Sequence, residues 1–254
     1  MPKVNIFCFN LAHFPDFFRE MGPFLLSPGE RERRDRFSLP HLGNRFAAAH
    51  IGLRLLLARQ LQPKAYWQDS ILLKTAASLA FDKGPFGKPK LKGPLPLAFN
   101  LSHSGDWAAL AIVDKDDPTK EPLEVGLDLE TVAQRSALAL AKRFFSPKEW
   151  QSLYLCPDYI QQNSFFTKLW TRKEACLKLW GTGMSTSLSS FEVLSKLPQN
   201  LTAQPLPLPQ CLYLRTTEVF KDMYLSLALN FLPDSVNINL INWTNHPTTF
   251  TFCH

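Results

Sequence analysis

One stretch, residues 165–184, constrains the fold of this chain more than any other. Its apolar residues recur at the i, i+3 and i+4 spacing of a helix that buries one face: Phe166, Leu169, Trp170, Cys176, Leu177 and Trp180. Gly181 and Gly183 follow, and glycine readily adopts the left-handed conformation that commonly ends a helix. The pattern predicts an amphipathic helix of about four turns. On another face of this helix, Thr171, Glu174 and Lys178 lie three and four residues apart.

The composition indicates a globular chain with enough apolar residues for a substantial core. Its 254 residues suit one large domain or two closely packed halves. Hydrophobic residues make up 45% and charged residues 20%, which argues against global disorder. The net charge of +6 favours an anionic partner, but the basic residues are dispersed. A nucleic-acid-binding protein would cluster them among exposed aromatics, so we expect no nucleic acid partner.

The cysteines and the apolar runs give expectations about the compartment. Five cysteines are scattered without a Cys-x-x-Cys pair, so neither a zinc site nor a disulfide framework is indicated: Cys8, Cys156, Cys176, Cys211 and Cys253. The first residues lack the apolar region of a signal peptide, and no run approaches the roughly 18 apolar residues of a membrane span. We therefore expect a cytoplasmic protein with no membrane partner.

The alternation of helical and strand-like segments predicts an α+β fold. Helices are expected from residue 27 and at 44–61, 134–144, 147–155 and 160–180. Strands are expected at 4–9, 99–104, 107–113, 123–130, 191–194, 211–219, 223–231 and 236–243. Segment 84–98 is too rich in Pro and Gly for a regular element, and the Pro-rich segment 197–209 is expected to be a surface excursion. A loop at 114–122 separates two halves, which we place at 1–118 and 119–254.

Two carboxylates in the apolar segment 123–130 are candidate metal ligands. Asp128 and Glu130 are two residues apart on a strand, so both point to the same face. Placing them together inside an apolar run is costly unless a cation neutralises them. Oxygen ligands with no neighbouring His or Cys suit Mg²⁺. The alternative is that these acids simply face water at the end of the strand.

Other polar residues are uninformative when they are taken singly. Glu174 and Lys178 are spaced like a surface helix pair that contributes about 0.2–0.5 kcal/mol. His103 is by itself more typical of a hydrogen-bonded structural histidine than of a catalyst, and Lys88 of an ordinary loop lysine. The chain contains no Walker loop, no Gly-x-Gly-x-x-Gly motif and no Gly-x-Ser-x-Gly motif.

Taken in order, however, these segments resemble the 4′-phosphopantetheinyl transferases, of the two-half type represented by the surfactin synthetase activator. The matching blocks are Gly-Lys-Pro at 87–89, Phe-Asn-Leu-Ser-His-Ser-Gly at 99–105, Gly-Leu-Asp-Leu-Glu at 126–130, Arg-Phe-Phe-Ser at 143–146, Trp-Thr-Arg-Lys-Glu-Ala-Cys-Leu-Lys at 170–178 and Gly-x-Gly at 181–183. A fainter match lies upstream at 27–45. The order and spacing of these blocks are specific, whereas the C-terminal part matches only in being strand-rich.

The resemblance implies a Mg²⁺-dependent enzyme that moves the 4′-phosphopantetheine arm of coenzyme A to a serine of an apo carrier protein and releases 3′,5′-ADP. It implies two similar α/β halves related by pseudo-two-fold symmetry, with the active site between them, in a monomer. Asp128, Glu130 and Glu174 would hold the metal ion. Glu174 could also take the serine proton, directly or through water, and Lys178 would contact the diphosphate. Asp128, Glu174 and Lys178 are thus the expected catalytic residues.

The resemblance also implies contacts to coenzyme A. Arg33, Arg45 and His103, with Ser102 nearby, match positions that hold the 3′-phosphate, whereas Gly87, Lys88 and Pro89 would border the adenine. One departure concerns Glu30, which stands where the family often has a basic residue. The phosphate clamp would then be looser, or rebuilt from Arg31 or Arg34.

A rival function is a protein that binds coenzyme A but catalyses no transfer. A non-catalytic coenzyme A-binding module would keep Lys88 and His103 but would not need three carboxylates. For the enzyme, the carrier could be acyl, peptidyl or polyketide, and the sequence favours none of these pathways.

Overall fold

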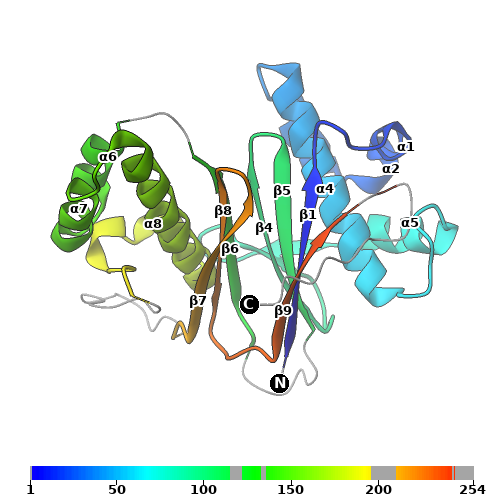
Figure 1. Cartoon of the computed structure of the whole chain (residues 1–254). Coiled ribbons are helices and arrows are strands. Elements are labelled where there is room, and N and C mark those ends of the chain that lie inside the picture. The colour runs from blue at the N-terminus through cyan, green and yellow to red at the C-terminus, as the bar shows by residue number, and fades with distance from the viewer. Residues whose placement is uncertain (1, 115–121, 133–135, 196–209, 242, 244–254) are drawn as a thin grey trace.

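The computed structural model of the chain describes residues 2–114, 122–132, 136–195, 210–241 and 243. These residues form helices and three sheets, which confirms the predicted α+β class. The two larger sheets lie at the centre of the molecule, and the helices lie on the two outer sides (Figure 1).

The first sheet has the strand order β4-β5-β1-β9. Its strands are β4 (Leu97–Ser104), β5 (Trp107–Asp114), β1 (Lys3–Asn10) and β9 (Ser235–Leu240). The pairs β4–β5 and β5–β1 are antiparallel, whereas β9 runs parallel to β1. Helices on this side are α1 (Asp16–Glu20), α2 (Gly22–Leu25), α3 (Pro28–Asp35), α4 (Pro40–Leu61) and α5 (Ser70–Ser78). Helix α4 is the long helix beside the sheet, and the others pack around it (Figure 1).

The second sheet is antiparallel and has the strand order β6-β8-β7. Its strands are β6 (Val125–Thr131), β8 (Met223–Leu229) and β7 (Tyr213–Phe220). Helix α8 (Tyr159–Trp180) packs against β6 and β8, and α6 (Ala137–Phe144) and α7 (Pro147–Tyr154) pack against α8 (Figure 1). Within the described ranges, no helix is long and apolar enough to cross a membrane.

The two sheets share a buried apolar core. Strands β1 and β5 contribute Ile6 and Ala111, and strands β6 and β8 contribute Leu127 and Leu227 to the same cluster. The side chains that alternate with these along each strand point to the other face of the sheet, where they pack against the helices. The described part of the molecule is therefore layered as helices, sheet, sheet and helices.

Most predicted elements are confirmed to within a few residues, but two predictions are wrong. Segment 84–98 is not wholly irregular, because β3 (Pro89–Leu91) pairs with β2 (Phe81–Lys83) in a short hairpin. The expected strand at 191–194 does not form: this segment follows the 3₁₀ turns η1 (Gly183–Ser185) and η2 (Leu188–Ser190) and contains a single bridge residue, Glu192. Residues 115–121 lie outside the described ranges, and the proposed boundary at 118–119 lies among them. Residues 196–209, which include the expected surface excursion at 197–209, also lie outside these ranges.

Helix α8 has the predicted buried stripe, and a charged residue completes it. Phe166, Cys176 and Leu177 are at most 2% exposed, and the helix ends at Gly181 with φ of 69°. Lys173 also lies on this stripe and is fully buried. Its Nζ lies 2.8 Å from Glu149 Oε2 on α7 and donates to the carbonyl oxygens of Leu188 and Phe191.

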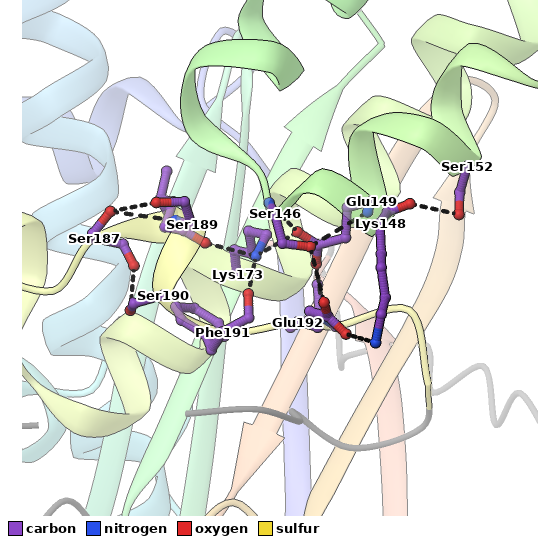
Figure 2. A network of polar contacts seen from close by, with 12 residues as sticks. Ser146, Lys148, Glu149, Ser152, Lys173, Ser187, Ser189, Ser190, Phe191 and Glu192 are labelled. Carbon is purple, nitrogen blue, oxygen red and sulfur yellow. Dashed lines mark hydrogen bonds and ion pairs between the residues drawn. The ribbon is translucent and has the colours of Figure 1, made fainter. Parts of the chain in front are cut away.

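Figure 2 shows the lysine enclosed by this network. The Glu149 carboxylate also accepts hydrogen bonds from the backbone N–H groups of Ser146 and Val193, at 2.9 and 2.8 Å. Burial lowers the pKa of Lys173, and the Glu149 charge opposes that change. The network joins α8, α7 and the segment after α8, so it fixes the rotation of α8 about its axis.

Candidate functional site

The candidate site begins where β6 and α8 approach most closely. A Cβ atom at Gly126 would lie 2.0 Å from the Ala175 carbonyl oxygen and 2.3 Å from the Leu179 nitrogen. These are backbone atoms that cannot move aside, so only glycine allows this contact. Asp128 and Glu130 follow Gly126 on the same face of β6. The glycine of the Gly-x-Asp-x-Glu motif thus brings both carboxylates against the helix that carries Glu174.

Strand β4 joins β6 through side chains instead of a backbone ladder. Asn100 Oδ1 accepts from the Leu127 N–H at 2.9 Å, Ser102 Oγ from the Leu129 N–H at 3.2 Å, and Ser104 Oγ from the Thr131 N–H at 3.1 Å. Because side chains alternate along a strand, these three point together towards β6. The alternating polar residues of the segment 99–105 therefore connect the two sheets beside the carboxylates.

Asp128 is buried with only part of its hydrogen-bonding capacity used. It is 4% exposed, and its Oδ1 accepts from Ser102 Oγ at 3.0 Å and from Lys178 Nζ at 2.6 Å. Its Oδ2 is buried and has no partner among the described residues. Burial raises the pKa of Asp128, although Lys178, Ser102 and the Leu129 N–H oppose the shift. A buried carboxylate with one unsatisfied oxygen is costly and would be stabilised by a cation.

Glu174 and Glu130 complete a group of three acids. Burial and the negative charges of Asp128 and Glu130 raise the pKa of Glu174, whereas Lys178 opposes the shift. Glu130 Oε2 accepts from Ser104 Oγ at 3.0 Å. In the described part of the chain, no three His, Cys, Asp or Glu side chains converge into a ready metal site. The charges of Asp128 and Glu130 act on Glu174, so the three acids lie near one another, and their role as metal ligands stays a prediction.

Lys178 and Ser102 lie next to Asp128 and bond to each other. Lys178 Nζ donates to Ser102 Oγ at 2.9 Å as well as to Asp128. The Ser102 hydroxyl thus donates to Asp128 and accepts from Lys178 and the Leu129 N–H, which uses its one donor and two acceptor positions. A contact between Ser102 and coenzyme A would require Lys178 to release this hydroxyl.

His103 and Arg33 belong to a positive region beside these acids. His103 is exposed at the surface, yet desolvation of its ring and the charges of Lys178, His50 and Arg33 lower its pKa. Arg33 comes from α3, and its guanidinium lies 5.0 Å from the centre of the Phe46 ring on α4. Residues from α3, α4, β4 and α8 therefore lie near one another here, and their contacts to a phosphate stay a prediction.

Arg45 and Lys88 are held by carboxylates. Arg45 Nη2 lies 2.5 Å from Asp106 Oδ1 in the turn between β4 and β5. Lys88 Nζ lies 2.6 Å from Glu124 Oε2, just before β6, and also donates to the Leu179 carbonyl oxygen at the end of α8. Burial lowers the pKa of Lys88, and the charge of Glu124 opposes that shift. Lys88 thus ties the β2–β3 hairpin to α8.

The other two predicted adenine contacts lie in the same hairpin. Gly87 has φ of 88°, in the left-handed region, and its N–H donates to the Gly84 carbonyl oxygen in the turn. Pro89 begins β3 and lines a pocket together with Lys88, Lys90 and Glu124. Of Gly87, Lys88 and Pro89, only Lys88 forms a hydrogen bond to α8 within the described part of the chain.

Several residues that contribute to this region were not predicted from the sequence. Glu124 and His50 gave no signal, because their partners lie far away along the chain. Lys173 did give a signal, since it occupies a stripe position three or four residues from Leu169, Trp170, Cys176 and Leu177. Ser146 and Glu149 also match the Ser-x-x-Glu capping box, which the structure confirms at the start of α7.

Comparison with known proteins gives consistent matches. Residues 124–228 match the family model of the 4′-phosphopantetheinyl transferase superfamily. A 4′-phosphopantetheinyl transferase of Bacillus subtilis is 35% identical over 142 residues, or 56% of each chain. The 4′-phosphopantetheinyl transferase psf-1 of Bacillus pumilus is 41% identical over 113 residues, or 44% of each chain. The 4′-phosphopantetheinyl transferase Sfp of Bacillus subtilis strain 168 is 31% identical over 168 residues, or 66% of each chain. The chain thus spans between 44% and 66% of these relatives.

Proposed function

Because the chain belongs to the 4′-phosphopantetheinyl transferase superfamily, we propose that it transfers the 4′-phosphopantetheine arm of coenzyme A to a serine of an apo carrier protein, releasing 3′,5′-ADP. The observation that carries this proposal is the buried Asp128, whose Oδ2 has no partner among the described residues, beside Glu174 and Lys178. Structural acids are normally satisfied by hydrogen bonds, whereas acids that await a cation are not.

The residues present fit a magnesium ion. Asp128, Glu130 and Glu174 offer only carboxylate oxygens, which Mg²⁺ prefers, and Asp128 Oδ2 is the atom most in need of a positive partner. When bound, Mg²⁺ would neutralise charge on the diphosphate and on the transferring phosphoryl group. Since Lys178 Nζ lies on Asp128 Oδ1, it satisfies part of this demand in the structure described.

The protein's own groups would perform the proton transfer and the positioning. Glu174, with its pKa raised by burial and by two neighbouring acids, would accept the proton of the carrier serine directly or through one water. Lys178 would donate to the diphosphate of coenzyme A. Ser102 would hold both Lys178 and Asp128 in place. Catalysis would then depend on orientation and electrostatics, without a covalent enzyme intermediate.

Coenzyme A would lie between two similar halves, 1–118 and 119–254, related by pseudo-two-fold symmetry. Supporting this proposal, each sheet packs against one long helix of 22 residues, α4 or α8. The 3′-phosphate would contact Arg33, Arg45 and His103, with Ser102 nearby, and the adenine would lie near Gly87, Lys88 and Pro89. The net charge of +6 suits an acidic carrier protein. A monomer in the cytoplasm is the expected context.

The test is mass spectrometry of apo acyl and peptidyl carrier proteins incubated with the protein, coenzyme A and Mg²⁺. We expect the carriers to gain the mass of phosphopantetheine. Asp128→Asn and Glu174→Gln should each reduce the rate by about a hundredfold or more, because each removes a charge that the reaction uses. Circular dichroism should show that both variants keep the fold.

A matched control uses an acid far from this chemistry. Asp16→Asn changes a side chain on α1 that is 94% exposed, and it should leave the rate unchanged. Calorimetry of coenzyme A binding distinguishes the rival function. Binding without transfer to any carrier would support the non-catalytic module and would contradict the enzymatic proposal.

A further inference from the structure

The positive region beside the acids contains one histidine to which the sequence assigned no role. The His50 ring stacks on Phe46 of the same helix, with ring centres 4.1 Å apart and planes tilted by 36°. The Arg33 guanidinium lies 5.0 Å from the centre of that same Phe46 ring. His50 is also close enough to His103 for its charge to affect that ring. Arg33 and His50 therefore contact the same Phe46 ring, and both lie close enough to His103 for their charges to act on it.

A carboxylate fixes the orientation of His50. Its Nδ1 lies 2.9 Å from Glu30 Oε1, and the two side chains are 24% and 13% exposed. An ionised carboxylate can only accept hydrogen bonds, so Nδ1 carries the proton in this pair. In the described part of the chain, Nε2 forms no hydrogen bond to another residue. A protonated His50 would thus present an N–H at Nε2 and would be stabilised by Glu30.

Glu30 itself is held rigidly. Arg54, which is 1% exposed, donates to Glu30 Oε2 from Nη2 at 2.7 Å and from Nε at 3.1 Å. The same oxygen accepts from the Ser27 N–H at 2.8 Å in the capping box of α3. These bonds leave the carboxylate no freedom to turn towards an incoming anion. Glu30 is therefore a fixed hydrogen-bond partner that orients the His50 ring.

The two arginines expected to compensate for Glu30 are engaged elsewhere. Arg31 donates to the Pro23 carbonyl oxygen, and Arg34 Nε lies 2.7 Å from Asp35 Oδ1. Both arginines are therefore bonded to groups other than His50 and His103. Where the family often has a basic residue at position 30, Glu30 here orients the ring of His50 on α4.

We propose that His50, oriented by Glu30, is a phosphate ligand that makes this site selective for a coenzyme carrying a phosphate monoester, here the 3′-phosphate of coenzyme A. This inference rests on the proposed function, which supplies the coenzyme. A monoester dianion placed between Arg33, His50 and His103 would receive charge-assisted hydrogen bonds from all three side chains.

The test compares binding of coenzyme A with binding of 3′-dephospho-coenzyme A by calorimetry, in the presence of Mg²⁺. His50→Gln keeps a donor for Glu30 but removes the second ring donor. We expect the affinity of this variant for coenzyme A to fall about tenfold, the size of one lost charge-assisted hydrogen bond, with no change for the dephospho form. His41→Gln is the matched control, because His41 is an exposed histidine on the same helix, and it should change neither affinity.

The outcomes separate this inference from the function on which it rests. A His50→Gln protein that keeps the wild-type preference for coenzyme A would overturn the role of His50 while transfer by the wild type continues. Failure of the wild type to bind coenzyme A would overturn both proposals. If His50→Gln does not fold, the imidazole resonances of wild-type His50 decide the question. They should move on addition of coenzyme A but not of its dephospho form, and no movement would refute the assignment.

Discussion

At the scale of single residues, Glu30 shows how one carboxylate can hold several elements together. It accepts from the start of α3, from Arg54 and from His50 on α4. Burial raises its pKa, but the hydrogen bond from His50, the charge of Arg54 and the bond from Ser27 outweigh that effect and lower it from 4.5 to about 2. A carboxyl with a depressed pKa stabilises the fold above its unfolded pKa, and that contribution is lost as the pH falls through the folded pKa.

Replacing Glu30 should therefore remove a pH-dependent part of the stability. We expect wild type to be more stable than Glu30→Gln near neutral pH, and the difference to shrink by about 2 kcal/mol between about pH 7 and about pH 3. Urea unfolding at a series of pH values measures this difference. Glu32→Gln on the same helix is the control, because the Glu32 side chain is 68% exposed, and the stability difference of this variant from wild type should stay small at every pH. If the difference in unfolding free energy between wild type and Glu30→Gln does not vary with pH, the lowered pKa of Glu30 is contradicted.

Residue-level prediction from the sequence worked where the chemistry lies within one element. The two-residue spacing of Asp128 and Glu130 predicts a shared face, and Gly126 brings that face against α8. The partners of these residues were not predictable in the same way. Ser102 bonds to Asp128 across 26 positions, and His50 bonds to Glu30 across 20. Such pairs depend on how β4 lies against β6 and α3 against α4, which no local periodicity encodes.

At the scale of elements, the rotation of α8 decides whether Glu174 faces β6. Lys173, the preceding residue, points into the buried network with Glu149 (Figure 2). Consecutive helix residues are separated by about 100° around the axis, so anchoring Lys173 on one side directs Glu174 to another. The lysine therefore serves α8 as an anchor.

Removing this anchor should be far more harmful than removing an exposed lysine. We expect Lys173→Met to lower the free energy of unfolding in urea by about 3–5 kcal/mol, because Glu149 would stay buried without its cation. Lys148→Met is the control, since that lysine is 69% exposed and pairs with Glu192 at 3.5 Å; its loss should stay below about 1 kcal/mol. The double variant Lys173→Met/Glu149→Gln should lose less than the sum of the single variants. Strict additivity would show that the two side chains do not act as a pair.

The elements themselves were predicted best where one face is apolar and the ends are marked. Helix α8 has its stripe and Gly181, and α7 has its capping box. The expected strand at 191–194 failed because its apolar residues, Phe191 and Val193, are buried against the helices and not paired in a sheet. Burial in an irregular segment leaves the same short apolar pattern as a strand. Helix α5 was missed, although Leu72, Leu73 and Ala76 are buried.

At the scale of the whole molecule, the two sheets depend on each other. Their facing sides share one core, which contains Val4, Ala109, Leu129 and Leu225. In addition, β9 belongs by sequence to the second half but pairs with β1 of the first. The first sheet therefore needs a strand from beyond residue 118, and each sheet needs the other to bury its inner face.

This interdependence predicts the behaviour of a fragment. Residues 1–118 expressed alone should not unfold cooperatively, because they would expose the apolar face of β1 and β5 and lack β9. The intact chain should unfold in a single transition that coincides by tryptophan fluorescence and circular dichroism. Two separated transitions in the intact chain, or a cooperatively folded fragment, would show instead that each half is an independent domain.

The pairing of β9 with β1 has a further consequence during synthesis of the chain. The ribosome makes β1 (Lys3–Asn10) long before its parallel partner β9 (Ser235–Leu240). Until then, one edge of β1 stays unpaired, and an exposed strand edge readily pairs with other chains. The nascent protein must keep this edge protected until β9 is made, so we expect its yield to depend on chaperones and on the speed of translation.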